Sequence, residues 1–206
     1  MDLSAVGVTI GPIVAGYLIG GIPFGLVVAR LVGGPDPRTI GSGRTGGANV
    51  LRALGPRAAV VAGLLDAAKG AVSALIPLLI GAGPVVQVLA ALAAILGHSR
   101  SPYIGFGGGR GIAPGFGGLA VIQPVLALAI VPIFGLILVG SRISSLASLT
   151  SSALAMVGLL VAVVAFGMHP AYAVYAVGGA AMIWLFHSDN IRRLLAGQER
   201  RIDLKR

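Results

Sequence analysis

The sequence predicts an all-α polytopic membrane protein with seven transmembrane helices, and three observations lead to this prediction. Of the 206 residues, 56% are hydrophobic and only 10% are charged, whereas soluble domains carry about 25% charged residues. The apolar residues are gathered in long runs, and the runs are separated by short segments that are either basic or rich in Gly and Pro. So few charges cannot cover a water-facing surface around so much apolar content, which excludes a soluble globule and a disordered chain.

The breaks between the apolar runs define seven expected spans within a single domain, residues 1–206. The spans cover roughly residues 4–31, 57–80, 84–97, 112–123, 125–140, 145–166 and 171–187. A helix needs about 20 residues to cross about 30 Å of hydrocarbon, so the spans 84–97 and 112–123 are short. We expect the glycine-rich segment between them, 98–111, to dip into the protein, because non-helical backbone at membrane depth is tolerated only where protein or a wet cavity surrounds it.

Basic segments and uncharged turns alternate strictly along the chain. The uncharged turns are 81–84, 123–124 and 167–170, and the 15 Lys and Arg residues lie in or beside the three other inter-span segments and the tail. Cytoplasmic loops carry the Lys and Arg excess of membrane proteins. We therefore expect the N-terminus outside and the C-terminus in the cytoplasm. The formal charge of +9 then lies in membrane loops, which favours anionic lipid or an anionic substrate over nucleic acid.

The first basic segment contains the run GSGRTGGANVLR at residues 41–52. Its glycines allow backbone N–H groups to point at an anion, and a following helix N-terminus adds positive potential. Arg44 and Arg52 can each bind phosphate oxygens through two N–H groups. The run is neither a Walker A loop nor a dinucleotide fingerprint, and a merely flexible loop is the alternative. The candidate phosphate-binding residues are Ser42, Gly43, Arg44, Gly46, Gly47 and Asn49.

The second span contains two charges, Asp66 and Lys69. Charges inside a membrane are costly and are usually paired or functional. At a spacing of three residues the two side chains share one helix face and can pair with each other. Structural pairing and support of a site are equally good explanations.

A second glycine-rich run, GHSRSPYIGFGGGRG, occupies residues 97–111. Gly108, Gly109 and Gly111 surround Arg110, and a helix is expected to begin directly after them. The positive-inside rule, by which Lys and Arg gather in cytoplasmic loops, is sufficient to explain Arg100. It does not explain why Arg110 lies among glycines. Two such loops on one membrane face would bind an anion better than either loop alone.

The tail begins with HSDNIRR at residues 187–193. His187 ends the last span on the same membrane face as both glycine loops, and a histidine with a near-neutral pKa can act as a general base. A capped or lipid-facing histidine is the alternative. Asp189 can orient the imidazole ring, and Asn190 lies on the same helical side if the helix continues. We expect supporting roles for Asp66, Lys69, His98, Ser144 and Asp189.

These motifs together resemble the bacterial integral-membrane glycerol-3-phosphate acyltransferases that use acyl phosphate as the donor. The runs that carry the resemblance are GSGRTGGANVLR, LLDAAKG, GFGGGRG, SRISSLAS and HSDNIRRLLAGQE. The resemblance implies transfer of a fatty acyl group from acyl phosphate to the sn-1 hydroxyl of glycerol 3-phosphate, which gives lysophosphatidic acid and phosphate. It implies a site facing the cytoplasm in the bacterial plasma membrane, no metal and no organic cofactor, and a supply of acyl phosphate from a soluble phosphate acyltransferase.

By position, residues of this chain match three motifs of that family. Ser42, Asn49 and Arg52 match the first motif, the glycines around Arg110 match the second, and His187 and Asn190 match the third. The chain departs from the family pattern at four positions: Arg44 replaces Asn, Ala48 replaces Thr, Arg110 replaces Lys and Pro114 replaces Thr.

The chemistry of such a transfer needs a base and a cationic cradle rather than a covalent nucleophile, because phosphate is already a good leaving group. We therefore assign catalytic roles to three residues: His187 as base or orienter, with a substrate phosphate oxygen as the alternative base, and Arg52 and Arg110 as phosphate ligands. The chain has no cysteine, which excludes a thiolate nucleophile. A transporter or channel for a phosphorylated small molecule is the rival function, and a non-catalytic membrane subunit is a third class.

Overall fold

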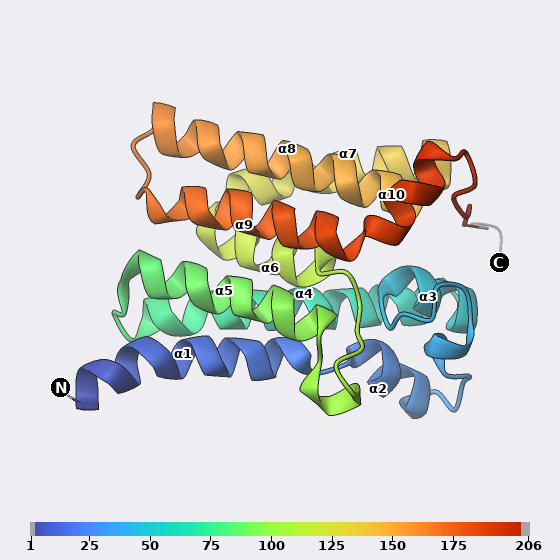
Figure 1. The fold of residues 1–206 in the computed structure, drawn as a ribbon, viewed down its shortest axis with the longest axis horizontal. Helices are drawn as coiled ribbons and strands as arrows, with labels where there is room; N and C mark the ends of the chain where they lie inside the picture. Colours follow the sequence, from blue (N-terminus) through green and yellow to red (C-terminus); the bar gives the residue numbers. More distant parts are fainter. Residues whose placement is uncertain (1–2, 203–206) are drawn as a thin grey trace.

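The computed structural model describes residues 3–202, and within that range the chain is helical without a β-strand (Figure 1). The α-helices are α1 (Leu3–Gly21), α2 (Phe24–Leu31), α3 (Gly47–Leu54), α4 (Pro56–Leu79), α5 (Gly83–Ser99), α6 (Ile112–Ile122), α7 (Pro124–Ser141), α8 (Ser144–Ala165), α9 (Ala171–Phe186) and α10 (Ser188–Leu195), and the 3₁₀ helices are η1 (Pro37–Thr39) and η2 (Pro102–Ile104). The N-terminus, which we expect outside the membrane, lies beyond the described residues. The basic residues Lys205 and Arg206 at the other end also lie outside this part of the chain.

Each of the seven expected spans corresponds to a helix or, for the first span, to a pair of helices. The span expected over residues 4–31 is divided into α1 and α2, which meet at an angle of 41°. The break lies at Pro23, which has no N–H group to continue the helical hydrogen bonds. Helices α4, α7 and α8 are long and apolar enough to cross a membrane, and five spans result if α1 with α2 and α9 with α10 are each counted as one bent span.

The helices lie side by side in a bundle whose two halves meet along α5, α6 and α9. Helix α1 packs along α5, α4 packs against both α5 and α6, and α8 packs against α7 and α9 (Figure 1). Glycines permit the closest of these contacts, because the backbone of Pro114 in α6 occupies the place where Gly70 of α4 would carry a Cβ atom. Pro114 lies in the first turn of α6, where a missing N–H group costs no helical hydrogen bond.

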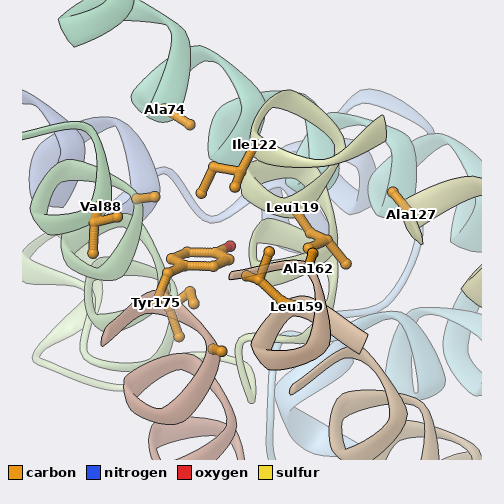
Figure 2. Packing of buried hydrophobic residues seen from close by; sticks show 11 residues of the cluster. Ala74, Val88, Leu119, Ile122, Ala127, Leu159, Ala162 and Tyr175 are labelled. Carbon is orange, nitrogen blue, oxygen red and sulfur yellow. The ribbon is translucent and has the colours of Figure 1, made fainter. Parts of the chain in front are cut away.

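A buried apolar cluster holds α4 to α9 together around Ile95, Leu119, Leu159 and Tyr175 (Figure 2). Large apolar side chains also cover the outer surface: Val164 is 85% exposed, for example. A soluble monomer rarely presents such a surface, but lipid tails solvate it, so helix association here relies on close packing rather than on exclusion of water.

Candidate active site

A cavity of about 630 Å³ lies at the end of the bundle where both glycine-rich loops and the break between α9 and α10 come together. Its polar end is formed by the loop before α3, the loop before α6 and the junction of α9 with α10. Its remaining wall is largely apolar and comes from α4, α6, α7, α8 and α9, including Phe116, Leu119, Ile130, Phe134 and Leu159. The cavity therefore has a cationic end and, continuous with it, an apolar chamber.

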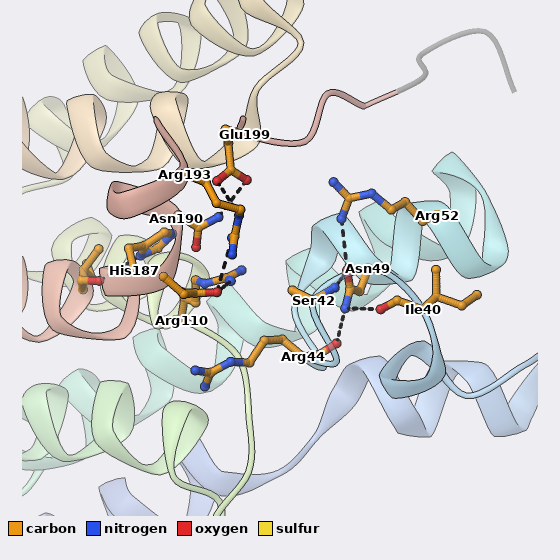
Figure 3. Close-up of polar contacts among 12 residues, drawn as sticks. Ile40, Ser42, Arg44, Asn49, Arg52, Arg110, His187, Asn190, Arg193 and Glu199 are labelled. Carbon is orange, nitrogen blue, oxygen red and sulfur yellow. Dashed lines mark hydrogen bonds and ion pairs between the residues drawn. The ribbon is translucent and has the colours of Figure 1, made fainter. Parts of the chain in front are cut away.

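Asn49, in the first turn of α3, braces the first glycine loop from inside (Figure 3). Its amide nitrogen donates to the carbonyl oxygens of Ile40 and Arg44, at 2.9 Å each, and its amide oxygen accepts from Arg52 Nη1 at 3.0 Å. Gly41 takes a positive φ of 61° in this loop, a conformation that favours glycine. The side chain of Asn49 is thus engaged with the protein itself, although the residue borders the cavity.

Arg44 extends from the first loop into the wall of the cavity (Figure 3). Among the described residues its guanidinium has no hydrogen-bond or ion-pair partner, and its positive charge acts on Arg110 and His187. A partly buried cation without a carboxylate beside it is suited to bind a phosphate group. The N-terminal end of α3, at Gly46 and Gly47, borders the same space and adds its partial positive charge.

The second glycine loop rests on the end of α5. The Gly109 N–H donates to the His98 carbonyl at 2.9 Å, and the His98 ring fills the space where residue 109 would carry a Cβ atom. The two loops meet here, since a Cβ atom at Gly46 would lie 3.8 Å from Gly109 Cα. The sequence predicted that both loops face one region, and the structure brings them into contact.

Arg110 follows this contact and lines the cavity with a side chain that is 15% exposed. Its Nη2 donates to Asp189 Oδ2 at 2.8 Å (Figure 3). Burial lowers the pKa of Arg110, while Asp189 opposes the shift. The same ion pair holds the pKa of Asp189 below its usual range against the effect of its partial burial.

His187 follows the last residue of α9 and is 3% exposed. Its Nδ1 lies 2.8 Å from the carbonyl oxygen of Ile183. Because a carbonyl only accepts, Nδ1 carries the proton, and Nε2 of the neutral ring is left as an acceptor. Burial, with the charges of Arg110 and Arg44, lowers the pKa of His187 to about 4, so the ring is neutral at pH 7.

The expectation that Asp189 orients the His187 ring was wrong. Asp189 instead binds Arg110 and, at 3.3 Å, Arg193, while the backbone carbonyl of Ile183 orients the ring. The physical reason is that each group already has a closer partner: the Arg110 guanidinium for the Asp189 carboxylate and the Ile183 carbonyl for His187 Nδ1.

Arg52 does not line the cavity. It lies behind the first loop, where one N–H group binds Asn49, and its other N–H groups have no hydrogen-bond partner among residues 3–202. Burial lowers the pKa of Arg52, and the nearby positive charge of Arg200 adds to this effect while Glu199 opposes it. Arg52 therefore faces the start of the tail.

The predicted residues thus divide into two sets. Those in the cavity wall are Ser42, Arg44, Gly46, Gly47, Asn49, Asp66, His98, Gly109, Arg110, Ser144 and His187. Those outside it are Gly43, Arg52, Lys69, Gly108, Gly111, Asp189 and Asn190. Asn190 donates to Glu199 Oε1 at 3.0 Å, and Arg193 binds the other oxygen of Glu199 at the same distance. Glu199 was not among the predicted residues, although it is an acidic residue within a basic tail.

The serines that continue along α8 beyond Ser144 and Ser145 were also missed. Ser145, Ser148, Ser151 and Ser152 all line the cavity. The hydroxyls of Ser145 and Ser151 are buried without a hydrogen-bond partner in the described part of the chain. Their spacing of three and four residues is the signal that would have placed them on one helix face.

Known proteins with similar sequences and structures share one description. The profile of the family described as glycerol-3-phosphate acyltransferase matches residues 10–197. A glycerol-3-phosphate acyltransferase of Anaeromyxobacter sp. (strain Fw109-5) is 41% identical over 194 residues, which cover 92% of this chain and 94% of that protein. Glycerol-3-phosphate acyltransferase 3 of Dehalococcoides mccartyi (strain CBDB1) is 40% identical, with 94% and 95% covered.

Two crystal structures of PlsY, described as an integral membrane glycerol 3-phosphate acyltransferase, have the same fold as this chain. The glycerol 3-phosphate form superposes with a TM-score of 0.85 at 37% identity and covers 97% of this chain and 96% of PlsY. The lysophosphatidic acid form gives a TM-score of 0.84 at 35% identity, with 98% and 96% covered.

Proposed function

The chain belongs to the glycerol-3-phosphate acyltransferase family, and on that premise we propose that it transfers a fatty acyl group from acyl phosphate to the sn-1 hydroxyl of glycerol 3-phosphate. The products are lysophosphatidic acid and phosphate. Membership in this family makes the protein an integral-membrane acyltransferase of phospholipid synthesis and replaces the transporter alternative. The observation that carries the proposed substrates is a cavity that joins a cationic end to an apolar chamber.

Two phosphorylated substrates suit the excess of positive charge at the polar end. Arg44 has no carboxylate partner among the described residues, and Arg110 keeps donors beyond the one that binds Asp189. We assign phosphate binding to Arg44, Arg110, Ser42 and the N-terminal end of α3. Arg52 would bind a phosphate placed between the first loop and the tail. The chamber below would hold the acyl chain, which needs no hydrogen bonds.

The proposed reaction is a direct transfer at the acyl carbon. The acceptor hydroxyl attacks the carbonyl carbon of acyl phosphate and loses its proton to His187 Nε2 or to a substrate phosphate oxygen. The tetrahedral intermediate then collapses, the bond from the carbonyl carbon to the phosphate oxygen breaks, and phosphate leaves with the electron pair. His187 returns its proton to the departing phosphate. Arg110 stabilises the negative charge that develops on the way, and the loss of such a donor typically costs about 10²–10³ in rate.

We also propose how the chain is arranged in the membrane. Seven crossings within one domain put the N-terminus outside and the site at the cytoplasmic face of the bacterial plasma membrane. The distribution of basic residues supports this arrangement, because Arg44, Arg110, Arg142 and Arg193 all precede or follow spans at one end of the bundle. A cytoplasmic site would receive glycerol 3-phosphate from water and acyl phosphate from a soluble phosphate acyltransferase.

Reconstitution into liposomes tests the substrates. The purified protein is given glycerol 3-phosphate together with acyl phosphate, acyl-CoA or acyl carrier protein loaded with the same chain, and the lipid product is identified by mass spectrometry and its acyl position by NMR. We expect 1-acyl lysophosphatidic acid from acyl phosphate alone. Product from acyl-CoA or the carrier protein would overturn the proposed donor, and a 2-acyl product would overturn the proposed acceptor hydroxyl.

A further inference from the structure

Two opposite charges are buried in the membrane-spanning helix α4. Asp66 and Lys69 are each 3% exposed, and Lys69 Nζ lies 2.7 Å from Asp66 Oδ1. A buried ion pair is rarely needed for stability, because apolar residues of similar size commonly stabilise a fold as well or better. Both side chains also contact other parts of the protein.

Lys69 holds the break between α1 and α2. Its Nζ donates to the carbonyl oxygen of Ile22 at 2.7 Å and lies 5.8 Å from the centre of the Phe24 ring. Helix α2 begins at Phe24 and then packs directly on the first glycine loop, where the carbonyl of Thr45 fills the space of a Cβ atom at Gly25. Lys69 thus fixes the start of α2. Helix α2 in turn packs against Thr45, the residue next to Arg44.

Asp66 holds the second loop from the opposite side. The same Oδ1 atom that binds Lys69 lies 3.5 Å from His98 Nδ1. His98 is buried, its ring lies against Gly109, and its carbonyl oxygen accepts from the Gly109 N–H. Arg110 is the next residue. One carboxylate oxygen therefore connects, through Lys69 and through His98, to the supports of both glycine loops.

We propose that Asp66, Lys69 and His98 form a positioning network that holds the two glycine loops in register, so that Arg44 and Arg110 face the same ligand. The network acts through the loops: Asp66 and His98 border the cavity, but their interacting atoms are turned toward each other and toward Lys69. This inference rests on the proposed function for the role of the two arginines. It rests on the contacts alone for the register of the loops.

A charge-swapped variant separates positioning from mere pairing. In Asp66→Lys/Lys69→Asp the ion pair is retained, but the cation is moved away from Ile22 and the carboxylate away from His98. We expect the melting temperature in detergent to stay within a few degrees, while kcat/KM for glycerol 3-phosphate falls at least about 10²-fold, the typical cost of one lost cationic donor. Asp66→Leu/Lys69→Met, which removes both charges, is the second variant if the swap does not fold, and it has the same expected outcome.

Matched variants complete the kinetic test. Ser73→Ala removes a buried hydroxyl of the same helix whose one partner among the described residues is the Lys69 carbonyl, and it should leave turnover and the melting temperature unchanged. Lys69→Arg keeps a cation near Ile22 and should retain most of the activity that the two double variants lose. Wild-type activity in either double variant, with the fold intact, would overturn the proposal.

A distance measurement tests the register without using catalysis. The chain has no native cysteine, so spin labels can be placed at Gly47→Cys and Tyr103→Cys, two exposed positions, one in each glycine-rich run. We expect a narrow distance distribution in the wild-type background and in Ser73→Ala, and a broad or shifted one in the charge-swapped variant. An unchanged distribution would overturn the network. If the distribution broadens in the charge-swapped variant but the wild-type protein makes no lysophosphatidic acid, the proposed function is overturned. The network would still be supported.

Discussion

Arg44 and His187 have the most favourable chemistry of the single residues at the polar end of the cavity. Arg44 is a cation without an acidic partner among the described residues, and His187 presents an unprotonated Nε2 because the carbonyl of Ile183 binds Nδ1. Arg44 is therefore available to bind a phosphate, and His187 is available to accept a proton. Arg110 differs, because it shares its charge with Asp189.

Arg44→Ala is predicted to lower kcat/KM by about 10²–10³-fold, because it removes one preorganised donor from the phosphate site. Arg44→Lys should recover only part of this loss, since an ammonium cannot bind two phosphate oxygens in a fixed plane. The measurement is steady-state kinetics in liposomes. Arg57→Ala is the control: it removes the same charge from an exposed residue outside the cavity, and an equal loss there would refute the assignment.

The acidic limb of the pH–activity profile is predicted to lie near pH 4 rather than near 6.5. The pKa of His187 is lowered to about 4, so the ring remains a neutral base as the pH falls to that value and becomes protonated only below it. The same shift weakens the fold in acid, because the unfolded chain binds a proton below about 6.5 that the folded chain does not bind until about 4. The melting temperature should therefore decrease as the pH is lowered from about 6.5 to about 4. The decrease should be smaller in His187→Asn.

Among the structural elements, the two glycine loops depend on a small number of close contacts. The first loop is held by the Asn49 amide, and the second by the ring and carbonyl of His98. Both loops carry an arginine to the cavity, so a small displacement of either loop would move a charge away from its ligand.

Gly109→Ala is predicted to displace the second loop, because its new methyl group would enter the space of the His98 ring. Such overpacking typically costs about 1–3 kcal/mol, and we expect a lower melting temperature together with a loss of activity. Gly107→Ala is the matched control in the same loop, because the nearest atom to its new methyl group is 3.4 Å away. Similar effects of the two substitutions would show that the loop does not depend on the His98 contact.

For the whole molecule, the arrangement across the membrane follows from the distribution of charge and can be measured with single cysteines. His169→Cys lies in the exposed turn before α9, and Gln198→Cys lies after α10. We expect a membrane-impermeant maleimide to label the first in intact cells and the second only after permeabilisation. The reverse pattern would invert the orientation and place the site outside the cell.

Much of the fold could be predicted from the sequence because its signals are local. Hydropathy and Gly or Pro breaks placed the spans close to the observed helices, and the short α6 and the glycine loops were expected where they occur. The break at Pro23 was overlooked because apolar residues continue on both sides of it. The glycine-arginine runs also marked most of the cavity's polar end, since phosphate-binding chemistry is carried by neighbouring residues.

The amino-acid sequence was sufficient for the membrane class, the approximate helix bounds and the family resemblance, because hydropathy, turn chemistry and motif spacing depend on neighbouring residues. The choice of partners required the three-dimensional structure. The pairing of Arg110 with Asp189 joins residues 79 positions apart, and the contact of Lys69 with Ile22 spans 47 positions. Such pairings depend on how the helices pack and on the direction in which each side chain leaves its helix, and neither is encoded in a local pattern.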